Sequence, residues 1–131
     1  MTQSRRGTGS SSARARRRAF VVDDNVETLT LLDDVVRNAG WETRCFTRLR
    51  SVRRALRESP PMLMILDDEL PDGRGGDLVQ ELRSDPRLRD VSVIVCTAAD
   101  PARQAEIGAW APVLSKPFSL ADLERYLQRA A

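Results

Sequence analysis

Long apolar runs are absent from this sequence. No stretch approaches the roughly 20 apolar residues that a membrane-spanning helix needs, and no apolar segment near the N-terminus resembles a signal peptide. With 131 residues, the chain has the length of one domain rather than two. We therefore expect one soluble, cytoplasmic domain without a membrane span.

Two residue types are scarce. The two cysteines, Cys45 and Cys96, lie in separate apolar runs without the spacing of metal ligands, so we expect buried, free thiols. Lysine is rarer still, because Lys116 is the single lysine among 21 basic residues. A compact ammonium in a chain that otherwise uses arginine indicates a position with its own chemical role, although chance placement is the alternative.

Acidic residues are missing from the N-terminal segment. Residues 1–19 carry six arginines and no acid, whereas residues 20–131 carry 15 basic and 19 acidic groups. The segment is also rich in serine and glycine and has no apolar periodicity, so we expect residues 1–18 to form a disordered basic tail. Such a tail is either a solubilising extension or a weak contact for nucleic acid, anionic lipid or an acidic partner.

From Ala19 onward, short apolar runs alternate with helical patterns. The runs that predict strands are 19–22, 41–46, 62–66, 91–96 and 112–115. Gly40 suits the end of the first helix, and a fourth, short helix is expected from Pro101, capped by Asp100, to Gly108. Ser119 with Asp122 resembles a capping box that opens the last helix. This alternation predicts an α/β fold, a doubly wound five-stranded parallel sheet flanked by five helices.

Polar residues follow the strands at their carboxyl ends. Asp23 and Asp24 follow the first strand, Asp67 the third, Thr97 the fourth and Lys116 the fifth. Ligands of such folds bind at this edge of the sheet, so these side chains are expected to converge there. Three neighbouring carboxylates repel one another and need a cation, and oxygen ligands of this kind suit Mg²⁺.

The sequence around these residues resembles a known family. VVDDN, ILDDELPDGRGG, VIVCTAA and LSKPF look like the motifs of receiver domains from two-component response regulators, in the same order and with similar spacing. The resemblance covers residues 19–131, which are expected to form a receiver domain. It implies a flavodoxin-like sheet with strand order 2-1-3-4-5.

The resemblance also implies a metal site. Asp24 and Asp67 are expected to ligate Mg²⁺ directly together with the backbone carbonyl of Glu69, and Asp23 mainly through water. The ion would gather the phosphoryl oxygens and offset their charge.

The same resemblance implies phosphoryl transfer. Asp67 is expected to take a phosphoryl group from a phosphohistidine of a sensor histidine kinase or of a histidine phosphotransfer protein. Lys116 and the Thr97 hydroxyl would contact phosphoryl oxygens, and the small Ala98 would leave room for the group. The domain would then be no enzyme in the usual sense, since it would catalyse only its own phosphorylation and dephosphorylation.

Three features depart from the family pattern. Many receivers have an aromatic residue three positions before the lysine, where this chain has Val113. The segment from Thr97 to Gly108 is shorter than usual by about one helical turn, roughly 6 Å. The segment after it is one residue longer and contains Trp110. The surface formed by the fourth helix, fifth strand and fifth helix is therefore expected to be atypical.

The sequence also bears on other functions. We expect no room for a DNA-binding or catalytic output module, so the output would be a contact that the receiver itself makes with a target that the sequence does not name. A phosphatase of the haloacid-dehalogenase kind would need a second aspartate where this chain has Glu69. A pseudo-receiver that binds proteins without phosphorylation is the main alternative, since Val113 and the short helix weaken the case for the usual switch.

Overall fold

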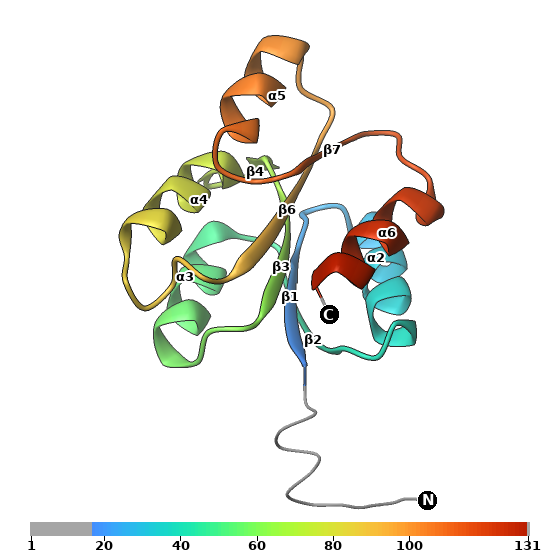
Figure 1. Cartoon of the computed structure of the whole chain (residues 1–131), viewed down its shortest axis with the longest axis horizontal. Coiled ribbons are helices and arrows are strands. Elements are labelled where there is room, and N and C mark those ends of the chain that lie inside the picture. The colour runs from blue at the N-terminus through green and yellow to red at the C-terminus, as the bar shows by residue number, and fades with distance from the viewer. Residues whose placement is uncertain (1–16, 131) are drawn as a thin grey trace, which may run out of the picture.

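The computed structural model describes residues 17–130 and contains one main sheet. Its five strands are parallel and lie in the order β2-β1-β3-β6-β7, which confirms the predicted fold class and strand order. The strands are β1 (Arg18–Val22), β2 (Glu42–Phe46), β3 (Leu63–Asp67), β6 (Ser92–Thr97) and β7 (Val113–Ser115). Figure 1 shows these strands in the middle of the molecule with helices on either side.

Helices cover both faces of the sheet. They are α2 (Val26–Asn38), α3 (Leu49–Glu58), α4 (Gly75–Ser84), α5 (Pro101–Gly108) and α6 (Leu120–Ala130). Buried residues of α2 and α6 pack on one face, and buried residues of α3, α4 and α5 pack on the other (Figure 1). Each face thus has its own apolar core, and β3, buried at every position, lies between them.

Side-chain caps mark the starts of α2 and α5, and the cap of α5, Asp100, was predicted from the sequence. The side chain of Asn25 caps α2, and that of Asp100 caps α5 by accepting the backbone N–H of Arg103 at 2.9 Å. Gly40 has φ +98°, the left-handed conformation expected just past a helix. The short α5, which ends at Gly108, is confirmed.

The structure differs from the prediction in three details. A two-stranded antiparallel sheet, β4 (Glu69–Leu70) and β5 (Gly73–Arg74), occupies what was expected to be a plain loop. The first strand begins at Arg18, inside the expected tail of residues 1–18. The remainder of that tail, residues 1–16, lies outside the described residues.

Cys45 is the third difference, since it is exposed whereas Cys96 is buried as expected. The prediction of two buried thiols was wrong for Cys45 because β2 is an edge strand, with a neighbouring strand on one side only. Both cysteines are free. Among residues 17–130, no helix is long and apolar enough to cross a membrane.

Candidate functional site

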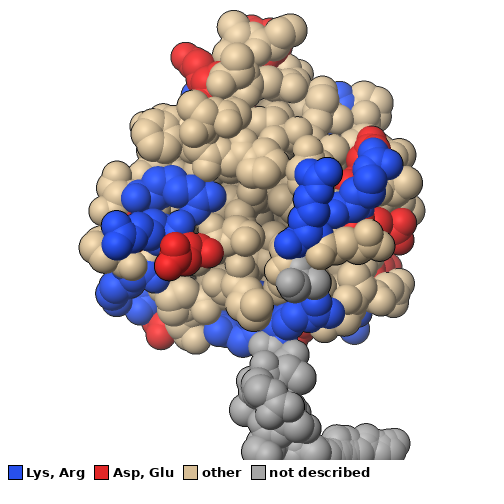
Figure 2. Space-filling view, in the orientation of Figure 1, with Lys and Arg blue, Asp and Glu red and all other residues tan. Residues whose placement is uncertain are grey.

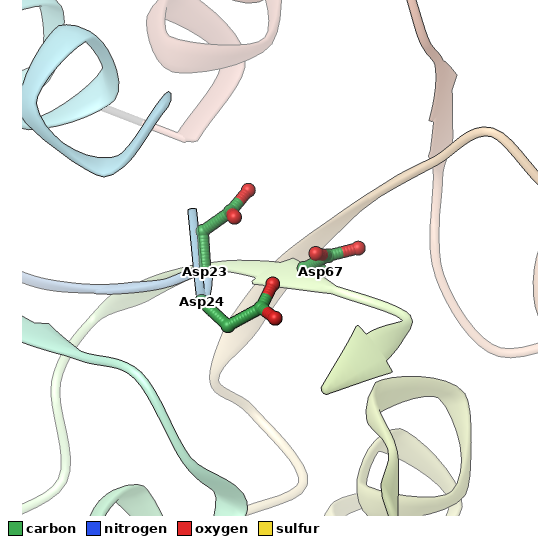
Figure 3. Close-up of side chains that lie close together, drawn as sticks. All are labelled: Asp23, Asp24 and Asp67. Carbon is green, nitrogen blue, oxygen red and sulfur yellow. The ribbon is translucent and has the colours of Figure 1, made fainter. Parts of the chain in front are cut away.

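Three carboxylates meet where β1 and β3 end. Asp23 and Asp24 directly follow β1, and Asp67 is the last residue of the neighbouring strand β3. One oxygen of each carboxylate lies within 4.8 Å of the others, and Figure 3 shows the three side chains close together. Asp23 and Asp67 are 1% and 6% exposed, whereas Asp24 is open to solvent. The structure therefore brings together the three side chains that the sequence predicted to converge.

Lys116, just after β7, reaches the same cluster. Its Nζ lies 3.2 Å from Oδ2 of Asp23 and 3.6 Å from Oδ2 of Asp67. The peptide bond between Lys116 and Pro117 is cis. One ammonium opposes three carboxylates, so the cluster has an excess of negative charge when all are ionised.

The electrostatics of the two central groups reflect this crowding. Burial raises the pKa of Asp67, and the carboxylates of Asp23 and Asp24 add to the effect, against the opposing Glu69 N–H and Lys116. Burial acts to lower the pKa of Lys116, but Asp67 and Asp23 outweigh it, so this pKa is raised. Lys116 is thus held in its charged form, and Asp67 is more costly to ionise than an ordinary aspartate.

Thr97 ends β6, the strand next to β3, and is fully buried. Its Oγ1 accepts the backbone N–H of Ala99 at 3.0 Å, which leaves the hydroxyl hydrogen available for another acceptor. Ala98, between them, is exposed. Thr97 therefore belongs to the same edge of the sheet as the carboxylates.

Glu69 lies beside Asp67 through its backbone. Its N–H donates to Oδ1 of Asp67 at 3.1 Å, while its side chain is exposed. The bond orients the Asp67 carboxylate. Any role of Glu69 in metal binding would thus be a role of the main chain, as the resemblance implied.

Gly75 explains how α4 can start so close to Asp67. A Cβ at this position would collide with the carbonyl oxygen of Asp67 and would lie 2.8 Å from Cγ of Leu66. The N–H of Gly75 also donates to the carbonyl oxygen of Asp68 at 2.9 Å. Only glycine permits this approach.

Sequence reasoning missed one pair at the site, Asp68 and Arg103. Asp68 is 1% exposed and accepts hydrogen bonds from Nη2 and Nε of Arg103 at 2.9 and 3.0 Å, and from the Gly76 N–H at 2.9 Å. Burial acts to raise the pKa of Asp68, but the hydrogen bonds from Arg103 and Gly76 outweigh it and lower the pKa. The signal in the sequence was the second aspartate after β3, whereas nothing marked Arg103 among the arginines.

The donor set fits a magnesium ion. The three carboxylates supply hard oxygen ligands, and a divalent cation would offset the negative charge that Lys116 leaves uncompensated. Asp24 is exposed, so water can complete the coordination. The same residues lack the nitrogen and sulfur ligands that zinc prefers.

Comparison with known proteins identifies the class. Residues 19–128 match the family described as "Response regulator receiver domain", so the chain belongs to this family and not to the dehalogenase class. It is 38% identical over 122 residues to the transcriptional regulatory protein GltR of Pseudomonas aeruginosa, covering 87% of this chain and 50% of GltR. The chain thus spans about half the length of that relative.

A second relative is matched over most of its length. The polar-differentiation response regulator DivK of Brucella ovis is 34% identical over 108 residues, which cover 77% of this chain and 85% of DivK. Among solved structures, a putative response regulator from Chloroflexus aurantiacus has a TM-score of 0.81 at 23% identity, covering 88% of this chain and 97% of that one.

A second solved structure is the receiver domain of a sensor histidine kinase from Pseudomonas aeruginosa, described with a magnesium ion coordinated in its active site cleft. It has a TM-score of 0.77 at 25% identity and covers 88% of this chain and 97% of that one. The family and the fold agree with the class that the sequence motifs indicated.

Proposed function

We propose that this receiver domain accepts a phosphoryl group on Asp67 from a histidine kinase or a histidine phosphotransfer protein, with Mg²⁺ bound at the carboxylate cluster. The observation that carries the proposal is the place of Asp67, a nearly buried carboxylate at the end of the central strand, with Lys116 Nζ 3.6 Å from its Oδ2. Family membership supports a role in two-component signalling. The signal would then pass to a target through the surface of the domain.

The transfer needs a nucleophile and a way to hold the phosphoryl oxygens. An Asp67 oxygen attacks the phosphorus, the bond from phosphorus to the histidine nitrogen breaks, and that nitrogen keeps the electron pair. Lys116 contacts one phosphoryl oxygen as a point charge, and the Thr97 hydroxyl donates its free hydrogen to another. A bound Mg²⁺ would supply electrostatic stabilisation of the transferred group.

The contacts that each carboxylate already makes indicate whether it would bind the ion directly or through water. Asp24 is exposed and Asp67 faces it, so both carboxylates can bind the ion directly, together with the Glu69 carbonyl. Asp23 already accepts the Asn25 N–H at 2.9 Å and lies 3.2 Å from Lys116. Its remaining capacity favours contact with the ion through water.

Asp67→Asn tests the proposal. We expect this variant to lose phosphorylation from a labelled small phosphodonor, because an amide is a poor nucleophile and a poor metal ligand. Asp34→Asn, on the exposed side of α2, is the matched control and should be labelled like the parent chain. Retention of an acid-stable, base-labile phosphoryl group by Asp67→Asn would show that another residue is the acceptor.

Mg²⁺ binding is tested separately. The ion at about 100 times its dissociation constant should raise the free energy of unfolding by about 2.7 kcal/mol, and Asp24→Asn should weaken this effect. A parent chain that neither binds Mg²⁺ nor takes up a phosphoryl group would instead be the pseudo-receiver, which binds proteins without phosphorylation. Val113 favours this alternative, because many receivers have an aromatic residue at its position.

A further inference from the structure

The main sheet has an open edge at the end opposite to Asp67. β7 pairs with Val95, Cys96 and Thr97 of β6, so the first half of β6 has no strand on that side among residues 17–130. The Val95 N–H donates to the carbonyl oxygen of Pro112 at 3.0 Å. Proline has no N–H, so the ladder cannot continue past Pro112 toward the start of β6.

The backbone of Val93 faces this edge, and the residue as a whole is 2% exposed. The Ser92 N–H donates toward β3, to Met62 O at 3.0 Å, whereas the Val95 N–H donates toward β7. Because backbone groups alternate between the two sides of a strand, the N–H and carbonyl of Val93 face the β7 side. Neither group has a hydrogen-bond partner within the part of the chain that the structure describes. This part of the edge therefore holds an unpaired donor and acceptor, and an added strand would pair with them after the side chains that cover Val93 move aside.

A groove of about 420 Å³ runs along this edge. Ser92, Val93 and Ile94 line it, with Arg83 and Arg89 on one side and Arg129 on the other. Figure 2 shows a hollow in the middle of this face with basic side chains on both sides. Three extended residues span about 10 Å, so the length of open edge suits a short strand segment.

Arg83 brings to the groove a positive charge that Asp90, an acid lining the same groove, opposes only at longer range. Its guanidinium donates to the carbonyl oxygens of Trp110, Arg89 and Val91, at 3.1, 3.0 and 2.8 Å. No carboxylate lies within 4.0 Å of it among residues 17–130, and its Nη2 makes none of these bonds. Burial lowers the pKa of Arg83, which reflects the cost of holding this charge away from water. An incoming carboxylate would offset that cost.

These features select one kind of occupant. A small anion could meet Arg83 but could not satisfy both the N–H and the carbonyl of Val93. The arginine-rich residues 1–16 would bring positive charge to a groove lined by three arginines and one acid, Asp90, and so would the same edge of a second copy, which carries the same arginines. We propose that the groove binds an extended acidic segment of a partner protein, which adds as a strand beside Ser92–Ile94 and places a carboxylate on Arg83.

A designed probe tests this with the full chain. The probe is a labelled, end-capped eight-residue peptide of alternating valine and glutamate, and its control alternates valine and lysine. We expect the glutamate peptide alone to bind, to shift the Val93 amide resonance and to slow exchange of that amide proton. Methylating alternate backbone nitrogens of the glutamate peptide should weaken binding about tenfold, because it removes strand hydrogen bonds without changing charge.

Variants locate the site. Arg89→Glu with Arg129→Glu should weaken binding about tenfold, because both exposed side chains line the groove. Arg54→Glu with Arg57→Glu, on exposed positions of α3, makes the same change of charge elsewhere and should leave binding unchanged. Both double variants should take up a phosphoryl group on Asp67 like the parent chain, and this result would show that they fold.

Four results would overturn the proposal. These are equal binding of the lysine peptide, equal binding of the methylated peptide, an unchanged Val93 amide, and displacement of the probe by inorganic phosphate at a similar concentration. Concentration-dependent self-association that the glutamate peptide blocks would assign the open edge to a second copy instead.

Discussion

Gly75 shows how one residue without a side chain sets the position of another. Its backbone lies against the carbonyl group of Asp67, where a Cβ would not fit. The two glycines at the start of α4 are both buried, so α4 begins directly against the end of β3. The place of the candidate acceptor thus depends on a residue that makes no polar contact with the cluster through a side chain.

Gly75→Ala should therefore damage the site. We expect a loss of about 1–3 kcal/mol in the free energy of unfolding, from overpacking against Asp67 and Leu66, and slower phosphorylation. Gly108→Ala is the control, because nothing lies within 4 Å of a Cβ there and alanine favours a helix. Urea unfolding and phosphodonor labelling measure both effects. Equal stability of the two variants would contradict the close approach.

The Asp68–Arg103 pair acts at the same scale. A carboxylate that is 1% exposed is balanced by a guanidinium that contributes two hydrogen bonds. Such a pair adds little net stability, but loss of one partner leaves a buried charge unpaired. The pair connects α5 to the residue that directly follows Asp67.

Among the elements, α3 is capped from a distant segment. Its own N-cap residue, Arg48, makes no side-chain cap bond, and Asp72 from the turn between β4 and β5 takes its place. The Asp72 carboxylate accepts the N–H groups of Leu49 and Arg50 at 2.8 and 2.9 Å. The bonds from Arg50 and Leu49 lower the pKa of Asp72.

Asp72→Ala should lower the melting temperature at neutral pH. A carboxyl whose pKa is lowered by folding stabilises the protein above its unfolded value, about 4, and loses this effect as pH falls through the folded value. The difference from the parent chain should therefore shrink below pH of about 4. Thermal unfolding across pH measures this, and Glu124→Ala on the exposed side of α6 is the control. A difference that grows in acid would contradict the capping role.

The helix α5 is the element most open to rearrangement. Ile107 is its one buried residue, and its anchor to the rest of the domain includes the pair that Arg103 forms with Asp68. Val113, where many receivers have an aromatic residue, is half-buried against the core and too small to change much surface by rotating. A response to charge at Asp67 is thus expected in α5 and its flanking loops.

Hydrogen exchange with and without a phosphoryl mimic tests this expectation. Protection should change across residues 98–112, which include Trp110, and stay nearly constant at Val113. Arg103→Ala should raise exchange in α5 even without the mimic, because it releases the anchor. Equal protection of residues 98–112 in the two states would contradict a response in α5. A change confined to α2 or α6 would indicate another output surface.

For the whole molecule, the two described residues that precede the family match, Arg17 and Arg18, contact the rest of the domain. Arg17 donates to the carbonyl oxygen of Ala39 at 3.2 Å and lies over the Trp41 ring, 4.9 Å from its centroid. Arg18 donates to Ser59 and Pro60. These two arginines join the start of β1 to the rest of the domain.

Deleting residues 1–16 should therefore leave folding and phosphorylation intact. Deleting residues 1–18 should lower the free energy of unfolding by about 1–2 kcal/mol, because it removes hydrogen bonds and a cation–π contact. Urea unfolding and phosphodonor labelling compare the two chains. Failure of the shorter deletion to fold would show that residues 1–16 are structural.

The sequence alone determined the fold class and the members of the carboxylate cluster. Continuous apolar runs predicted β3 and β6 as covered strands, and parallel strands bring their carboxyl ends to one edge. The sequence therefore predicted that Asp23, Asp24 and Asp67 lie close together. Such predictions succeed because strand period and chain order are local properties of the sequence.

Only the tertiary structure decided the pairings across elements. Arg103 lies 35 positions from Asp68, and which arginine meets a buried aspartate depends on how α5 packs beside α4. Exposure of Cys45 and the open edge at Val93 likewise depend on which strand lies next to which, and for how many residues. Hydrophobic periodicity records which face of an element is buried, but not which partner covers it or where that partner ends.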